Sequence, residues 1–537
     1  MSYQLVHSFK RHTMRSLPLL FLSCSISPFP RAVSGLPFTF RGQSTQSDDN
    51  DGKNDYYEDG DVEGRVRGSL MDAEIDGVSG IPTFHVNPAA HSGGLRRNDV
   101  VESFFTDSTP AASTSSTSAA SQNLSKEIHR KAHEINDFLL FSRRFLHQHP
   151  ELMYQEEITS AFILKTLDQM GIEYTTGWGV NTVPTRIQGP GGYGIVADIG
   201  TGEQPCVLLR ADFDALPIHE RTENIDFKSR HDGKMHACGH DSHTTMLLGA
   251  ASLLKSMEDS INGTVRLMFQ PAEEGGAGAK RMREEGVLTM EPKPKYAFAQ
   301  HVWPTIPSGT IASRPGPILA AAERFEILIS GVGGHAAMPH LTVDPIVTAS
   351  SIVMNLQTLV SRNLSPLESG VCSITKFEAG DAYNVIPHSA LLRGTIRALS
   401  TETLLSLQKR VQHVVDSTAA VHGANVTITY SPDYYPPTVN DPELFENFSK
   451  DVASLVAEDG KLTDIEPTMG AEDFSFVAES IPSTFFLLGQ GSGTSPPTSY
   501  GLHHPHFALD ESVMPRGVEL HVNVALRALH KLANEEA

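Results

Sequence analysis

Three short apolar segments that alternate with helical segments constrain the fold of this chain more than any other feature. They are CVLLRAD (206–212), TVRLMFQ (264–270) and AFAQHV (297–302), and SHTTMLLGAASLLKSM and AGAKRMREEG lie between them. Short apolar runs of this length are typical of buried strands, and the intervening segments have helical length and spacing. Because strands joined by helices form right-handed crossovers, they run parallel. The sequence therefore predicts an α/β domain with a mixed, mainly parallel sheet.

Further helical patterns flank this alternation. SKEIHRKAHEINDFLLFSRRFLHQHPE (125–151) stops at Pro150, and EEITSAFILKTLDQMGIEY (156–174) is ended by Gly171. From about residue 318 the order changes to strand, helix, paired antiparallel strands, helix and strand, which is typical of a ferredoxin-like unit. We therefore predict a first domain formed by residues 123–317 and 431–537, with a ferredoxin-like α+β domain of residues 318–430 inserted into it.

The beginning of the chain has a different composition. Residues 1–47 contain no Asp or Glu, carry several Lys and Arg, and include the apolar segment LPLLFLSCSIS. This pattern favours a cleaved targeting segment for an organelle or the secretory route, with a disordered tail in a cytoplasmic protein as the alternative. The acidic run at 48–65 and the Ser/Thr/Ala-rich run at 108–122 have too little apolar surface to fold. We therefore exclude residues 1–122 from the predicted fold.

Charge and cysteine content narrow the possible functions. The 537-residue chain has a formal net charge of −21, which opposes binding to nucleic acids and to anionic membrane surfaces. No apolar run is long enough to span a bilayer. The four cysteines are scattered and do not form a disulfide framework. We therefore expect neither nucleic acid nor a membrane as a partner.

The segment MHACGHDSHTT (235–245) contains three histidines and a cysteine within eight positions. A polar turn is the simplest alternative, but four ligand-type side chains in one turn disfavour it. A redox disulfide needs a second cysteine nearby, and a structural zinc site needs two local ligand pairs. Mixed ligation by Cys, His and carboxylate fits a catalytic metal site that keeps one position for water.

Acidic side chains follow the predicted strands. Asp212 and Asp214 follow the first strand, Glu273 and Glu274 follow the second, and His301 ends the third. Ligand sites in open α/β sheets lie outside the carboxyl ends of the strands, so these groups should converge on one edge. Adjacent buried glutamates are costly unless a cation offsets their repulsion. One can bind the metal while the other accepts a proton from metal-bound water; a solvated acidic loop is the alternative.

A set of motifs, taken together and in order, resembles the dinuclear metallo-aminoacylase/carboxypeptidase family over about residues 125–535. The motifs are RRFLHQHPE, LLRADFDALPIHE, MHACGHDSHTTMLLGAA, FQPAEEGGAGAKRM, GGHAAMPH, DPIVTAS, NVIPHSALLRGTIRAL, MGAEDFSF and LHHPHF. The most similar branch is that of indole-acetyl-amino-acid (auxin-conjugate) hydrolases and hippurate hydrolases. The resemblance implies an inserted lid and dimerisation domain, and a homodimer formed through it.

The resemblance also implies a role for each matching residue. It implies two divalent ions, Zn²⁺ or Mn²⁺, held by Cys238, His240, Glu274, His301 and His503. Glu273 matches the general base, Asp214 the carboxylate that orients the site, and His335 the inserted domain's histidine, which often reaches the partner's active site. Asn384 and Arg397 match residues that hold the substrate.

Several histidines and acids lie close in the sequence to the residues that match the family's ligands. His503 is preferred over His504 because it lies two residues before proline, as the family's ligand does. His236 and His243 have no ligand role in that pattern, and the roles of Asp241 and Glu472 stay open.

These observations favour a metal-dependent amidohydrolase that cleaves N-acyl amino acids with metal-activated water. A dipeptidase or carboxypeptidase on the same scaffold is one alternative. A catalytically silent metal-binding or interaction protein is another, although the presence of Glu273 argues against it.

Overall fold

The computed structural model describes residues 114–491, 498 and 500–536. The predicted targeting segment and the acidic run lie outside these residues. None of the described helices is long and apolar enough to cross a membrane.

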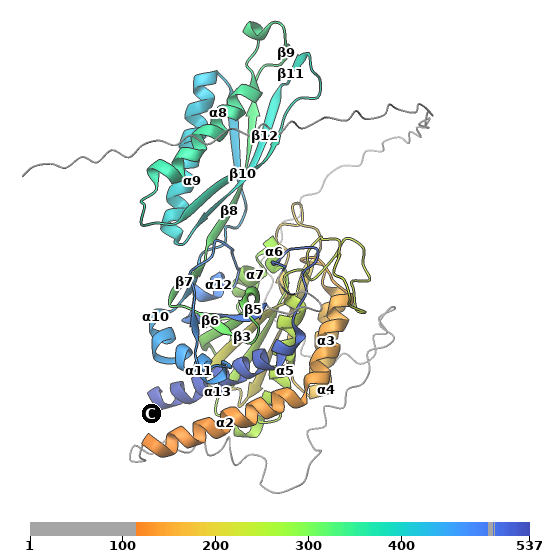
Figure 1. Ribbon diagram of the computed structural model, residues 1–537, viewed down its shortest axis with the longest axis vertical. Helices are drawn as coiled ribbons and strands as arrows, with labels where there is room; N and C mark the ends of the chain where they lie inside the picture. Colours follow the sequence, from red (N-terminus) through yellow and green to blue (C-terminus); the bar gives the residue numbers. More distant parts are fainter. Residues whose placement is uncertain (1–113, 492–497, 499, 537) are drawn as a thin grey trace, which may run out of the picture. The chain divides into compact units, whose positions relative to one another are not determined.

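An eight-stranded mixed sheet forms the larger part of the structure (Figure 1). Its strands, in spatial order, are β1 (Tyr174–Val180), β2 (Gly191–Gly200), β4 (Thr264–Gln270), β3 (Cys206–Asp212), β5 (Pro294–Pro307), β16 (Ser483–Gly491), β6 (Ile311–Ser313) and β15 (Thr463–Asp464). The central strands β4, β3, β5 and β16 run parallel to one another, whereas β1 and β2 pair antiparallel at one edge. The mainly parallel sheet predicted from the sequence is therefore confirmed, although β1 and β2 were not predicted.

Apolar clusters cover both faces of this sheet. In β3, Leu209 belongs to a cluster with α5 (His240–Lys255) and α13 (Met514–Glu536), whereas Leu208 belongs to a second cluster with α7 (Gly278–Glu284) and α12 (Ser475–Ala478). All residues of β3 and β4 are buried. Burial on both faces explains why these strands are continuous apolar runs rather than alternating patterns.

The helices before the sheet differ in part from the prediction. α4 (Glu157–Met170) ends at Gly171 as predicted, with φ of 66° at that residue. The segment 125–151 forms two helices, α2 (Thr114–Glu134) and α3 (Asn136–Gln148), rather than one.

The Ser/Thr/Ala-rich run at 108–122 was predicted to be unfolded, but α2 already begins inside it. α2 runs beside α13 in Figure 1, and Arg527 of α13 donates hydrogen bonds to the Ser121 carbonyl (2.8 Å) and Ser125 Oγ (2.9 Å). Because this stabilising contact comes from the far end of the chain, local composition did not predict it.

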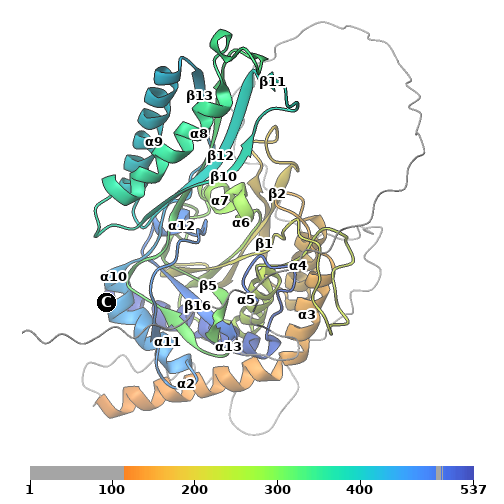
Figure 2. The same cartoon turned by 45° about the horizontal axis from the view of Figure 1, so that its top comes forward.

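A second, four-stranded antiparallel sheet is formed by residues 321–430. Its order is β10 (Gly370–Glu378), β12 (Ser389–Ala398), β8 (Ala321–Ser330) and β13 (Asn425–Tyr430). α8 (Pro345–Thr358) and α9 (Thr401–His422) lie on one face of this sheet and cover its apolar cluster (Figure 2). The chain order β8-α8-β10-β12-α9-β13 places the segment between β7 (Gly316–Leu319) and β14 (Thr438–Asn440), which pair with each other. The exact domain boundaries remain predictions.

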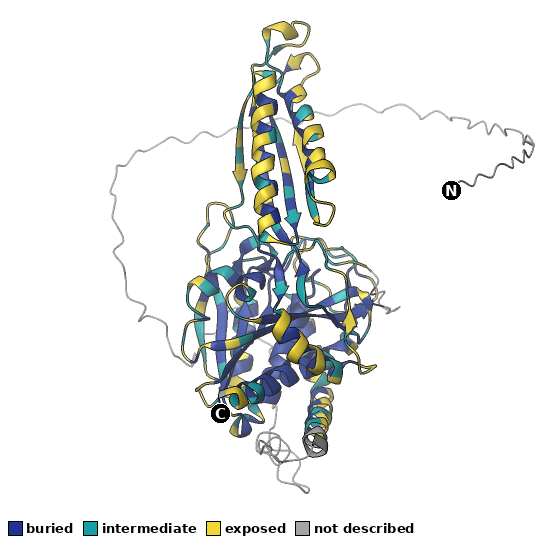
Figure 3. Cartoon of the chain, turned by 90° about the vertical axis from the view of Figure 1, so that its left-hand side faces the viewer, coloured by how far each residue is buried: buried dark blue, intermediate teal, exposed yellow. Residues whose placement is uncertain are grey.

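Burial differs between the two sheets (Figure 3). The larger sheet and the helix α5 are almost wholly buried, whereas α8 and α9 expose one side each. The short strands β9 (Gly334–His335) and β11 (Val385–Ile386) pair with each other at one end of the second sheet.

Candidate metal centre

Ligand-type side chains meet at the carboxyl ends of the central strands. Cys238 and His240 flank Gly239, whose φ of 89° turns the chain into α5. Glu273 and Glu274 stand on the short helix α6 (Glu273–Gly276), which follows β4. His301 lies in β5, and His503 lies after β16 with φ of 61°.

The distances place all five predicted ligands in one cluster. Cys238 Sγ lies 3.4 Å from His301 Nε2 and 3.3 Å from His503 Nε2. His503 Nε2 lies 3.2 Å from Glu274 Oε1. Three groups have ligand atoms within 4.8 Å of one another: Cys238 with His240 and His301, Cys238 with Glu274 and His503, and His240 with both Glu273 and Glu274. Because these groups share members, they form one continuous cluster.

The hydrogen bonds around the histidines fit metal ligation. His301 donates Nδ1–H to the Val302 carbonyl over 2.7 Å and directs Nε2 toward Cys238. His240 Nδ1 lies 3.3 Å from Asp214 Oδ1, while the buried Nε2 has no hydrogen-bond partner among the described residues. Metal-binding histidines characteristically bond a carbonyl or carboxylate through one nitrogen and the metal through the other. The donor set therefore fits divalent ions such as Zn²⁺.

The charge of the site also favours cations. Six carboxylates are clustered here: Asp212, Asp214, Glu273, Glu274, Glu472 and Asp473. The buried Arg210 guanidinium contacts Asp212 (2.7 Å), Glu472 (2.9 Å) and Asp473 (2.8 Å). One guanidinium cannot neutralise all six carboxylates. Burial and the nearby Glu472 therefore raise the pKa of Glu273 well above its usual value.

The two adjacent glutamates have different surroundings. Burial opposes ionisation of Glu274 as well, but His503 and His240 lower its pKa below the usual value. Glu274 thus faces the histidines, whereas Glu273 faces other carboxylates. This difference suits Glu274 as a ligand and Glu273 as a proton acceptor.

Two carboxylates hold the turn that carries these glutamates. Asp214 accepts hydrogen bonds from the backbone amides of Glu273 (2.9 Å) and Glu274 (2.9 Å). Glu156, which is fully buried, accepts one from the amide of Ala272 over 2.9 Å. Ala272 has φ of 57°, a left-handed conformation that is costly for a residue other than glycine. Asp214 and Glu156 therefore both bind the turn that carries the two glutamates, and the contact of Glu156 was not predicted from the sequence.

Groups other than the five predicted ligands bind His243, His504 and Asp241, whereas both ring nitrogens of His236 are buried without a hydrogen-bond partner among the described residues. His243 directs Nδ1 toward Asp212 Oδ1 (2.7 Å), and its Nε2 accepts a hydrogen bond from the Val302 amide (3.0 Å). His504 stacks on Tyr500 with ring centroids 4.6 Å apart, so the structure brings His503 and not His504 to the cluster. Asp241 belongs to a buried network with Arg143 (3.2 Å) and His147 (2.7 Å). His236 is buried, which lowers its pKa to about 4.

A cavity of about 1160 Å³ joins the cluster to the second sheet. Its lining includes Cys238, Glu273, Glu274, His301 and His503 together with Arg324, Arg393 and Arg397 of the second sheet. Arg397 is half-buried and donates hydrogen bonds to Thr395 Oγ1 (3.1 Å) and the Met469 carbonyl (3.4 Å). Arg397, predicted to hold the substrate, therefore lines the same cavity as the cluster.

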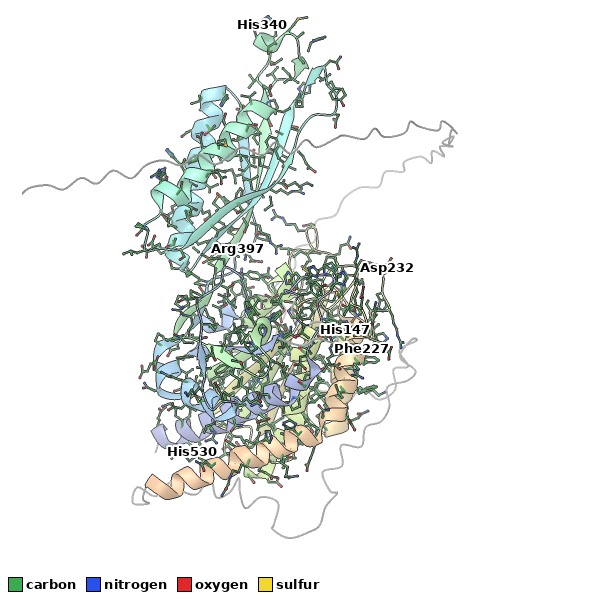
Figure 4. All side chains as sticks on the ribbon, viewed as in Figure 1. His147, Phe227, Asp232, His340, Arg397 and His530 are labelled. Atoms are coloured by element: carbon green, nitrogen blue, oxygen red, sulfur yellow. The ribbon has the colours of Figure 1, made fainter. Side chains whose placement is uncertain are left out.

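The structure does not bring His335 and Asn384 into this cavity. Both are exposed and lie together, since the Ala336 amide donates to the Asn384 carbonyl over 3.0 Å. Arg397 pairs with Ala322 at the start of β8, whereas His335 follows the opposite end of that strand. A ten-residue strand spans roughly 30 Å. Figure 4 accordingly shows Arg397 beside the larger sheet and His340, which follows His335 in the chain, at the far end.

Comparisons with known proteins show which family the chain resembles. Residues 208–527 match the model of peptidase family M20/M25/M40. The chain is 43% identical over 406 residues to the Arabidopsis thaliana protein named IAA-amino acid hydrolase ILR1-like 4, covering 75% of this chain and 88% of that protein. It is 38% identical over 395 residues to the N-acetylcysteine deacetylase of Bacillus subtilis, covering 73% and 97%.

A solved structure is similar as well. A Bacillus subtilis protein described as a dinuclear metal-binding peptidase from the M20 family superposes with a TM-score of 0.60 at 35% identity, over 74% of this chain and 99% of that one. On the family match, the relatives and the structural likeness, the chain belongs to peptidase family M20/M25/M40.

Proposed function

We propose that the protein is a metal-dependent amidohydrolase that cleaves N-acyl amino acids. The observation that carries this proposal is a cluster of five metal-ligand side chains and Glu273, of which Cys238, Glu273, Glu274, His301 and His503 line a cavity that Arg397 also lines. The relatives named as an IAA-amino acid hydrolase and an N-acetylcysteine deacetylase support this substrate class, since both names describe N-acyl amino acids.

The proposed ligands would hold two divalent ions, Zn²⁺ or Mn²⁺. They are Cys238, His240, Glu274, His301 and His503. When bound, such ions supply Lewis acidity and lower the pKa of bound water to about 7. The relative described as a dinuclear metal-binding peptidase supports the number of ions.

The chain's own groups would move the proton and hold the substrate. Glu273 would accept the proton of the attacking water and deliver it to the leaving amine, for which its raised pKa is suited. Asp214 would keep Glu273 in place through the amide it already binds. Arg397 would pair with the free carboxylate of the amino-acid half.

We further propose a homodimer formed through the inserted domain, which would act as a lid. The helix α8 and the neighbouring loops expose several large apolar side chains, namely Leu341, Ile346, Val347, Met354 and Val385. Exposed apolar groups gathered in this way mark an interaction surface. In such a dimer, His335 and Asn384 would line the partner's cavity, since they do not line the cavity of their own chain.

The proposal is tested by assaying the purified full chain with Zn²⁺ or Mn²⁺. Benzoyl- and indole-acetyl-amino acids should be cleaved faster than unmodified dipeptides, and far faster than the corresponding amino-acid amides, which lack the carboxylate. Cleavage of dipeptides alone would favour the carboxypeptidase or dipeptidase alternative. Equal kcat/KM for acids and amides would remove the role of Arg397.

A further inference from the structure

Helices α2 and α13 contact each other through a row of polar side chains. Arg527 donates to Ser125 Oγ (2.9 Å), and Ser125 in turn donates to Asn523 Oδ1 (3.1 Å). Nearer the start of α13, His129 Nδ1 lies 2.9 Å from Glu519 Oε1. The residues of this row recur every four positions on both helices, so they form one ridge on each.

The last contact of the row differs from the others because three ionisable groups share it. His133 Nε2 also faces Glu519 Oε1, at 3.7 Å, and the two imidazole rings lie 4.4 Å apart. A separation of 3.7 Å is too long for a hydrogen bond. His133 therefore contacts Glu519 at ion-pair distance and not through a hydrogen bond.

The spacing of these donor atoms fits a transition-metal ion. One donor atom from each of His129, His133 and Glu519 lies within 4.8 Å of the others. Zinc ligands lie about 2.0–2.2 Å from the ion, so two of them at a tetrahedral angle are roughly 3.4 Å apart. The two measured N···O separations, 2.9 and 3.7 Å, bracket that value.

The surroundings also suit a metal site. The Glu519 side chain is 6% exposed, and the histidine side chains are 54% and 51% exposed, so an ion could enter from solvent. A pair of histidines four residues apart on one helix can bind zinc from the same face. Imidazole and carboxylate donors together select Zn²⁺, Ni²⁺ or Cu²⁺ rather than Ca²⁺ or Mg²⁺.

We infer that His129, His133 and Glu519 form a second, surface metal site that joins α2 to α13. The site is separate from the cluster around Cys238, and both histidines precede the residues that match the family model. A bound divalent transition-metal ion would link the N-terminal helix to the C-terminal one and favour the folded chain by mass action.

The test is a count of ions in the full chain after chelation and dialysis against Zn²⁺. The wild type should bind one Zn²⁺ per chain more than the His129→Ala/His133→Ala double variant. His413→Ala, which removes an exposed histidine from α9, is the matched control and should bind as many ions as the wild type. Adding Zn²⁺ should also slow amide hydrogen exchange in α2 of the wild type and not of the double variant.

The same count in chains with an altered proposed active site distinguishes binding at the surface site from binding at that active site. In Cys238→Ala/His301→Ala chains, whose proposed catalytic ligands are incomplete, the surface site should still bind Zn²⁺, and this binding should disappear when His129 and His133 are also replaced. An equal ion count with and without the two histidines, in both backgrounds, would overturn the inference. Circular dichroism would verify that each variant is folded.

Discussion

Glu273 and Glu274 are neighbours in the sequence, yet the structure gives them opposite electrostatic surroundings. Burial and Glu472 keep the pKa of Glu273 well above its usual value, whereas His503 and His240 lower the pKa of Glu274 despite burial. The sequence could predict that two glutamates follow a strand. It could not predict this asymmetry, because the groups that produce it come from other parts of the chain.

Replacing each glutamate should therefore have a different effect. Glu273→Gln should retain bound metal but lower kcat by about 10²-fold or more, because it removes the proton carrier. Glu274→Gln should lose metal as well as activity. Metal analysis and kinetics on the same samples check this, and an active Glu273→Gln enzyme would show that the base is another group.

At the scale of elements, local patterns predicted the central strands and two of the helices that pack near them. β3, β4, β5, α4 and α5 were predicted because apolar runs and a terminating glycine mark them. The edge strand β1 and its neighbour β2 are rich in glycine, so they were missed. The start of α2 was missed because packing on α13, rather than composition, stabilises it.

The same distinction applies to the site. The proposed ligands were predicted from motifs. The contacts of Arg210 and Glu156 were not predicted, because their partners lie on other elements of the chain. Sequence alone could not place His335 in the short strand β9, at the end of β8 that lies away from the cluster.

The turn before α6 gives a prediction at this scale. Glu156→Ala should leave the buried amide of Ala272 without an acceptor, at a cost of about 1–3 kcal/mol of stability. Because Ala272 directly precedes the two glutamates, metal affinity and kcat should also fall. Glu156→Gln, which keeps an acceptor oxygen, should restore most of both. If thermal stability falls while metal affinity and kcat do not, Glu156 has only a structural role.

At the scale of the whole molecule, two of the residues proposed to act on the substrate lie away from the cavity of their own chain. Arg397 lines the cavity, but His335 and Asn384 lie at the far end of the second sheet. A second copy that packs against the exposed apolar side chains near α8 would provide the missing groups.

Mixing two inactive variants tests this dimer. Glu273→Gln and His335→Ala chains, allowed to exchange subunits, should form some hybrid sites with both wild-type groups. Activity should then rise well above that of either parent. If mass spectrometry confirms exchange and the rate does not rise, His335 does not act across the interface.

The central claim, that the cluster around Cys238 is a catalytic centre for two metal ions, is tested most directly by metal removal and return. Chelated full-length protein should lose its N-acyl amino acid hydrolase activity and regain it as Zn²⁺ or Mn²⁺ is added. In the His129→Ala/His133→Ala background, recovery should be complete at two ions per chain, and Cys238→Ala should abolish it. Full activity of the metal-free protein, or full recovery in Cys238→Ala/His301→Ala, would contradict the account.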